Sequence, residues 1–334
     1  MKSTLSVLVA ASTLALLCAC GGGGDSTPTP PSKAPVAITS ANQSDVARAS
    51  VNGGLAVSLA QGALGSGATP AGVTSRSHAL GLTMQRALQL ATSQRMAIAG
   101  ASAHPATVST DVSNCDVSGS MTIEVNDKDS NSRLSNGDVL TATFAQCKES
   151  ATLSVSGTVV ITIAGTPTDT QFAASAQFQG LTVQDSGVTS TLAGTVAISE
   201  SDTSTLSDTT ITVGNDGLSA TMASSGYNDA VVFESGMVVT TSVSGTTSTF
   251  SVAMAGSFTA QSIGGRVTIA TPVALSQGFG DTYPSHGQVR ITGASGSTLL
   301  ATVLSDTQVE LKLDANGDNT FESTSIVAWS TLIP

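Results

Sequence analysis

The sequence has few charged residues, and its cations are unevenly placed. Only 10% of the 334 residues are charged, and no lysine or arginine lies between Lys148 and Arg266. A basic groove cannot be built from a stretch without cations, and a net charge of −11 repels phosphate groups and anionic lipids. We therefore expect no nucleic-acid partner.

Recognised catalytic motifs are also absent from the sequence. It contains no Gly-x-Ser-x-Gly elbow, no His-Glu-x-x-His motif and no Gly-x-x-x-x-Gly-Lys phosphate loop. The three histidines, His78, His104 and His286, are far apart in the sequence. A pair of carboxylates could still hydrolyse a glycoside, but aromatic residues, which form sugar platforms, make up only 3% of the chain. We predict that the protein is not an enzyme and keep a carboxylate-based hydrolase as an alternative.

The first residues have the layout of an export signal. Lys2 supplies one positive charge, an apolar run from Leu5 to Leu17 follows, and the run ends in Leu17-Cys18-Ala19-Cys20. This ending resembles the lipobox of bacterial lipoproteins, and the glycines that follow resemble the tether of functionally unassigned proteobacterial lipoproteins. The resemblance implies a signal peptide over residues 1–19, lipid attachment at Cys20 and a place in the outer membrane. The alternative is an ordinary signal peptide that is cleaved after Ala19.

Removal of residues 1–19 changes the charge and the cysteine count. The remaining chain has 11 basic and 23 acidic residues, a net charge of −12. Cys115 and Cys147 are then the cysteines without a role, and outside the cytoplasm a disulfide between them is expected. Residues 20–40 have almost no large apolar side chain, so we predict a flexible tether that links the body to the membrane.

Residues 41–104 are predicted to be helical. Leu80, Met84, Leu88 and Ala91 recur at helical spacing, which predicts a helix over residues 75–99 that packs against the rest of the protein. The earlier segment, 45–64, is interrupted by Gly53-Gly54 and has a weaker helical pattern.

Residues 105–334 have the period of two that is typical of antiparallel strands with one buried face. Apolar residues alternate with serine and threonine in several segments, one of them containing Met121, Ile123 and Val125. The sequence therefore predicts a mainly β protein (α+β), in which a helical segment precedes a large antiparallel sheet.

Glycines recur in phase with the apolar residues of these strands. The series is Gly119, Gly157, Gly194 and Gly256, with weaker members at Gly226 and Gly293. If each marks a bend, we expect a strongly curved sheet, such as a half-barrel of repeated hairpins. The alternative is that glycine is simply abundant.

Residues 127–138 carry oxygen-bearing side chains at alternating positions. They resemble the twelve-residue calcium loop of EF-hand and dockerin-like proteins, although Ser132 replaces the usual glycine and Asp138 the usual glutamate. The resemblance assigns as ligands Asp127, Asp129, Asn131, Arg133, Ser135 and Asp138. A solvated turn is the alternative, because turns favour the same residue types.

A second acidic stretch begins at Asp314 and repeats the first half of this pattern. Its twelfth position is Ser325, which leaves the closing ligand undetermined. The predicted ligands are Asp314, Asn316, Asp318 and Thr320. Both stretches lie between strands, so calcium in them would stiffen a hairpin.

These features predict a lipid-anchored structural or binding lipoprotein with calcium as a structural cofactor. One alternative is a carrier or chaperone that holds an acyl chain or a lipoprotein on the concave face of the sheet. Another is an adhesin, because exposed sheet edges can pair with other strands. An open apolar cavity would favour the carrier, and a filled core would count against it.

Overall fold

The computed structural model describes residues 32–62 and 108–333, except for positions 132, 169, 186, 225, 226 and 280. Its helical elements are α1 (Gln43–Gly62), the 3-10 turn η1 (Ala294–Gly296) and α3 (Trp329–Leu332). Its strands are β1 (Val108–Asn114), β2 (Ser118–Asn126), β3 (Val139–Lys148), β4 (Leu153–Ile163), β5 (Gln171–Asp185), β6 (Val188–Asp202), β7 (Leu206–Ser224), β8 (Tyr227–Phe233), β9 (Val238–Ser244), β10 (Thr249–Ala260), β11 (Gly265–Gly278), β12 (His286–Thr292), β13 (Thr298–Val303), β14 (Gln308–Asp314) and β15 (Ser323–Ala328).

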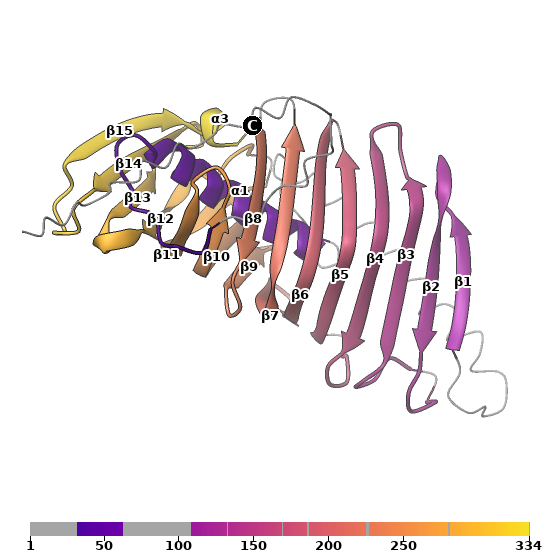
Figure 1. Cartoon of the computed structure of the whole chain (residues 1–334). Helices are drawn as coiled ribbons and strands as arrows, with labels where there is room; N and C mark the ends of the chain where they lie inside the picture. Colours follow the sequence, from indigo (N-terminus) through magenta and orange to yellow (C-terminus); the bar gives the residue numbers. More distant parts are fainter. Residues whose placement is uncertain are drawn as a thin grey trace, which may run out of the picture.

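All fifteen strands belong to one antiparallel sheet, which confirms the predicted mainly β fold. The strands follow one another in chain order from β1 to β8 and from β10 to β15, while β9 pairs with β7 and β10 beside that path. β1 to β8 form a broad wall, and the strands after β8 curl round α1 (Figure 1). β1 and β15 lie at opposite ends of the sheet (Figure 1).

One face of the sheet is apolar and buried, and we call it the inner face. In β2 to β7 the exposed fraction of its central side chains, such as Met121, Ile161, Phe178 and Ile198, is 5% or less. The opposite, outer face carries mainly serine and threonine, some of them hydrogen-bonded between strands, as Thr143 is to Thr158. The predicted alternation of buried and solvated side chains is therefore confirmed.

α1 differs from the prediction for residues 45–64, in which Gly53-Gly54 interrupt the helical pattern. The helix runs without a break from Gln43 to Gly62, and it contacts β7, β8, β12, β13 and α3. At Gly53 a Cβ atom would lie 3.2 Å from the ring of Phe233, so a small residue lets the helix approach the sheet. The helix predicted over residues 75–99 lies outside the described residues. None of the described helices is both long and apolar enough to cross a membrane.

The segment before α1 is attached to the sheet by main-chain hydrogen bonds. Val36 donates to and accepts from the backbone beside it, at Arg266 and Ala294, and Ile38 is fully buried. The side chain of Arg266, whose backbone bonds to this segment, forms a bidentate ion pair with Glu234. Residues 34–36, in the stretch predicted as a tether, are therefore attached to β11 at Arg266.

The predicted glycine repeat corresponds to a line of bulges across the sheet. Gly119, Gly157, Gly194 and Gly256 all have positive φ, and the ladder register shifts at or beside each of them. At Gly157 a Cβ atom would lie 2.5 Å from the carbonyl oxygen of Gly180 on the next strand, so only glycine fits there. Gly226 lies outside the described residues, and Gly293 lacks a positive φ and instead packs beneath Val36.

The C-terminal end of the chain consists of the last strand and a short helix. β15 ends at Ala328, and Trp329 begins the short helix α3, where only 2% of it is exposed. Its ring stacks on Tyr283, with centroids 6.1 Å apart, and its indole N–H donates to the carbonyl oxygens of Pro284 and Ser305. Trp329 therefore has a structural role.

Candidate functional site: two acidic hairpin loops and a cleft

The first acidic loop connects β2 to β3, as the sequence predicts. Asp127 follows the last residue of β2, and Asp138 directly precedes Val139, which pairs with Asn126 across the hairpin. Carboxylate oxygens of Asp127, Asp129 and Asp138 lie within 4.8 Å of one another. The fold thus brings together three of the six predicted ligands as one carboxylate group.

Hydrogen bonds inside this loop hold the carboxylates in position. Asp138 is fully buried and accepts from the backbone N–H groups of Lys128 and Ser135, at 3.0 and 2.8 Å. The Ser135 hydroxyl donates to Asp129 at 2.8 Å and holds the pKa of Asp129 below its usual value. Ser135 therefore lies inside the cluster, as predicted.

The two remaining predicted ligands of the first loop lie on its exposed side. Asn131 donates its amide to Asp129 and accepts the backbone N–H of Arg133 at 2.6 Å. The Arg133 side chain is a cation without acceptor atoms, so any contribution to a metal site would come from its carbonyl oxygen. Asn136 accepts the backbone N–H of Gly165, which links this loop to the turn after β4.

The second acidic loop connects β14 to β15 and has a different closing residue from the one considered in the sequence. Carboxylate oxygens of Asp314, Asp318 and Glu322 lie within 4.8 Å of one another. Ser325, the twelfth position, already belongs to β15 and pairs with Leu311. Glu322 directly precedes β15, so the hairpin closes at the ninth position of the loop.

Backbone N–H groups organise this second loop. Buried Asp314 accepts from Gly317 and Asn319, at 2.7 and 2.8 Å, and Asn316 accepts from Asp318. Thr320 donates its N–H to Asp318 at 2.7 Å, which lowers the pKa of Asp318. Each of the four predicted residues therefore takes part in the turn, and Glu322 is the residue that sequence reasoning missed. Its position directly before a strand was the available signal.

The predicted disulfide between Cys115 and Cys147 is present. Cys115 directly follows β1 and Cys147 lies in β3; their Cα atoms are 5.4 Å apart, and Cys147 is fully buried. The ladder register shifts at Gly119, and Gln146 opposite it also has a positive φ, which turns Cys147 to the inner face. The expected pairing of the two cysteines is therefore confirmed.

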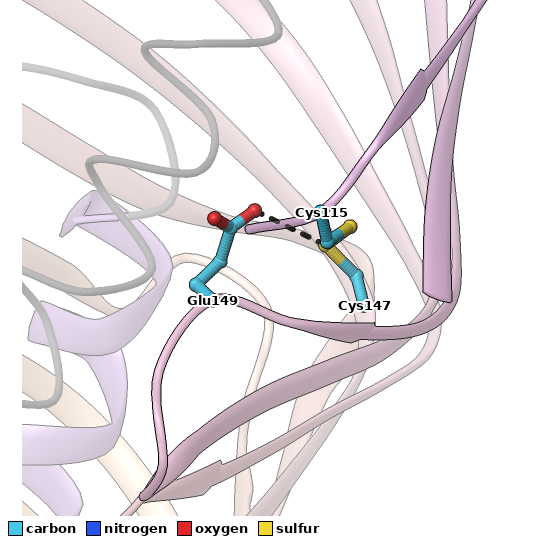
Figure 2. A group of neighbouring side chains, drawn as sticks. All are labelled: Cys115, Cys147 and Glu149. Atoms are coloured by element: carbon cyan, nitrogen blue, oxygen red, sulfur yellow. Dashed lines mark hydrogen bonds between the residues drawn. A yellow bond between two sulfur atoms is a disulfide. The ribbon is translucent and has the colours of Figure 1, made fainter. Parts of the chain in front are cut away.

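Glu149 lies beside this disulfide (Figure 2). Its Oε1 atom is 3.2 Å from Sγ of Cys147. A carboxylate and two cysteines could form a metal site if the sulfurs were thiolates. Because the sulfurs are bonded to each other, this group functions as a crosslink.

A cleft of about 440 Å³ lies at one end of β5, β6 and β7. Glu200 and Asp208 line it, together with Phe172 and the turn that contains Gly165. Burial, with a smaller contribution from the charge of Asp202, raises the pKa of Glu200 to about 7. Neither β5, β6 nor β7 contains a lysine, arginine or histidine, so these three strands offer no cation to offset the charge.

His286 is exposed at the start of β12, while His78, His104 and Cys20 lie outside the described residues. No protein-family model matches the sequence, and a search of curated proteins finds no significant match.

Proposed function

We propose that this chain is a lipid-anchored extracytoplasmic lipoprotein with a structural or binding role, and that calcium stiffens its two acidic hairpin loops. The observation that carries the calcium proposal is the convergence of three carboxylates in each loop. Calcium prefers six to eight oxygen ligands, and the loops offer side-chain and backbone oxygens around these carboxylates. Like charges this close repel one another unless a cation lies between them.

The position of the loops supports a structural role for the ion. Each loop joins two paired strands, and each group includes a buried carboxylate, Asp138 or Asp314, that backbone N–H groups hold in place. An ion there would join the ends of two strands. It would therefore stabilise the hairpin, and the protein around it, by binding the folded state alone.

Thermal unfolding of the full chain tests the calcium proposal, with Cys20→Ser used to keep it soluble. Calcium at a hundred times its dissociation constant should stabilise the fold by about 2.7 kcal/mol per site, which corresponds to a rise in Tm of roughly 5–10 °C. Excess chelator should remove the rise. Asp127→Ala/Asp129→Ala should lose the part of the calcium-dependent rise in Tm that comes from the first loop. Asp318→Ala/Glu322→Ala should lose the part that comes from the second loop.

Asp306→Ala is the matched control, because Asp306 is an exposed aspartate in the turn after β13. This variant should respond to calcium as the parent protein does. An unchanged Tm in millimolar calcium for the parent protein would reduce both loops to ordinary turns.

Lipid anchoring is proposed from the resemblance of residues 17–20 to a lipobox and is tested separately. Metabolic labelling with a radioactive fatty acid should label the full chain, and Cys20→Ala should abolish the label. Cys18→Ala is the control, because Cys18 precedes the proposed cleavage point and should leave labelling intact. Labelling of the Cys20→Ala variant would contradict the proposed anchor.

The cleft supports a carboxylate-based hydrolase as the second candidate function. Glu200, with its pKa near 7, would be the protonated general acid. Asp208 is not its partner, because Glu200 pairs with Thr209 and Asp208 with Ser201, which places the two carboxylates on opposite faces of the sheet. A panel of chromogenic glycosides and esters tests it. Turnover that falls at least about a hundredfold in Glu200→Gln, the usual minimum effect of a general acid, would support this function. Equal background rates in the two proteins would eliminate it.

The carrier alternative is not favoured. An acyl-chain carrier needs apolar surface that a ligand can reach, whereas the central inner-face side chains of β2 to β7 are almost fully buried.

A further inference from the structure

The two ends of the sheet each present a strand edge that no other described strand covers. β1 pairs with β2 only, and β15 pairs with β14 only. The outer edge of such a strand exposes backbone N–H and C=O groups that can pair with another chain. Proteins usually protect such edges with lysine, proline, a bulge or a covering element.

Both end strands lack most of these protections and expose apolar side chains instead. On the outer face, Val108 and Val112 of β1 are 56% and 62% exposed, and Ile326 of β15 is 58% exposed. Neither strand contains lysine, arginine or proline, and each ladder to its neighbour is free of register shifts. Asp111 is the one charged residue in the two strands. It pairs with Ile123 on the inner face, so β1 has one inward-pointing charge, which is a further edge protection, and β15 has none.

The directions of the two strands favour pairing between copies. The path from β1 to β15 contains 14 strands, and each is antiparallel to the next. An even number of alternating strands means that β1 and β15 run in opposite directions. A second copy placed in line with the first therefore brings its β15 antiparallel to β1, which is the pairing used throughout the sheet.

Side-chain position then selects a register. The outer-face residues are even-numbered in both strands: Val112 pairs with Thr122, and Ile326 with Glu310, both on the outer face. Directly opposed residues of antiparallel strands share a face. Placing Val112 opposite Ile326 unites the most exposed apolar side chain of each edge as a β-branched pair.

Pairing of β1 with another β1 is less favourable. Full antiparallel overlap of two identical seven-residue strands puts Asp111 directly opposite Asp111, and opposed like charges destabilise a sheet. We therefore propose that copies of this chain associate head to tail, with β15 of one copy extending the sheet of the next beside β1 and Ile326 opposite Val112. Such an interface repeats, so the assembly can exceed two copies.

Cysteine crosslinking of the full chain in the bacterial envelope tests the arrangement. After oxidation, Val112→Cys/Ile326→Cys should give a ladder of three or more linked copies on a non-reducing gel. The two positions lie at opposite ends of one sheet, so they cannot link within a copy (Figure 1). Each single variant should remain monomeric. Dimers from Val112→Cys alone would show β1–β1 pairing, dimers from Ile326→Cys alone would show β15–β15 pairing, and either result would overturn the proposal. A monomeric double variant would do the same.

A second measurement avoids new cysteines. Val112→Lys or Ile326→Lys should lower the association constant in sedimentation experiments by at least about tenfold, equivalent to about 1.4 kcal/mol. Val117→Lys is the matched control, because Val117 is 56% exposed but lies in the turn between β1 and β2. Equal association of all three variants, with unchanged Tm, would contradict the proposal.

Discussion

The hairpins β2–β3 and β14–β15 carry the two acidic loops and are built differently around them. In the first, the Cys115–Cys147 disulfide and a bulge at Gly119 constrain the end opposite the loop. In the second, the ladder from Gln308–Ala328 to Leu313–Ser323 is regular, and no disulfide joins the described residues of this hairpin. The first hairpin is thus restrained at both ends, and the second depends on its loop and its pairing.

The loops themselves differ in length but follow one rule. The first spans residues 127–138 and the second residues 314–322, yet both begin at the end of one strand and finish with a carboxylate directly before the next. Asp138 is fully buried, whereas Glu322 is exposed. The difference shows that strand spacing, and not the twelve-residue pattern, selects the closing carboxylate.

The largest expected effect comes from the bulge that only the first hairpin has. At Gly119 (φ +80°) a Cβ atom would lie 2.1 Å from the carbonyl oxygen of Gln146, so Gly119→Ala should cost about 3–5 kcal/mol. Gly137 also has positive φ but meets only the end of Lys128, at 3.9 Å. Gly137→Ala should therefore cost only about 1–2 kcal/mol. Urea unfolding of both variants measures the difference, and equal losses would mean that the close approach is unimportant.

The disulfide should have the next largest effect. It joins residues separated by 32 positions, and the loop-entropy relation gives about 3–4 kcal/mol for a loop of that size. Reductant should lower the free energy of unfolding of the parent protein by this amount, measured by urea denaturation, and Cys115→Ala/Cys147→Ala should be insensitive to reductant. Hydrogen exchange should show the first hairpin opening while the second is unchanged. Equal loss of exchange protection in both hairpins would contradict the view that the disulfide restrains only the first hairpin.

Removal of a loop carboxylate should distinguish the two hairpins even without calcium. Asp138→Ala leaves the backbone N–H groups of Lys128 and Ser135 without their acceptor in a buried site, at a cost of about 2–3 kcal/mol. Asp318→Ala should cost much less, because Asp318 is exposed and water can replace it. Thermal unfolding in chelator compares the two variants. Equal costs would show that burial does not distinguish the loops.

The sequence predicted the sheet because its physical causes are local. Alternation of apolar with serine and threonine side chains determines which face is buried, and glycine in phase with the apolar residues located the bulges at Gly119, Gly157, Gly194 and Gly256. Both acidic loops could be located from the sequence for a similar reason. Turn-forming residues between two segments with alternating apolar side chains predict a loop that joins two strands.

The features that sequence reasoning missed depend on contacts between distant segments. α1 continues through Gly53 because Phe233 packs against it, which helix propensity does not register. Trp329 leaves the last strand to stack on Tyr283, and residues 34–36 dock on β11 from more than 200 positions away. Glu200 and Asp208 line one cleft only because β6 and β7 are paired.

The smallest expected effect is a pH dependence of stability that arises from Glu200 on β6, outside both hairpins. Its folded pKa of about 7 exceeds the ordinary value of 4.5, so the folded state binds more protons than the unfolded state between those values. Stability should therefore fall as pH rises from about 4.5 to 7 and then level off. The full shift corresponds to about 3 kcal/mol, but Glu200 is only half-buried, and solvent screening reduces the expected loss to about 1 kcal/mol.

Denaturation midpoints in chelator across this range measure the slope, and two substitutions assign it. Glu200→Gln should flatten it, whereas Glu124→Gln, at an exposed outer-face position of β2, should leave it intact. Asp129 and Asp318 do not produce this slope, because their pKa values are lowered and their titration moves further below this pH range. A slope that persists in Glu200→Gln would assign the pH dependence to other groups and remove the electrostatic basis for chemistry in the cleft.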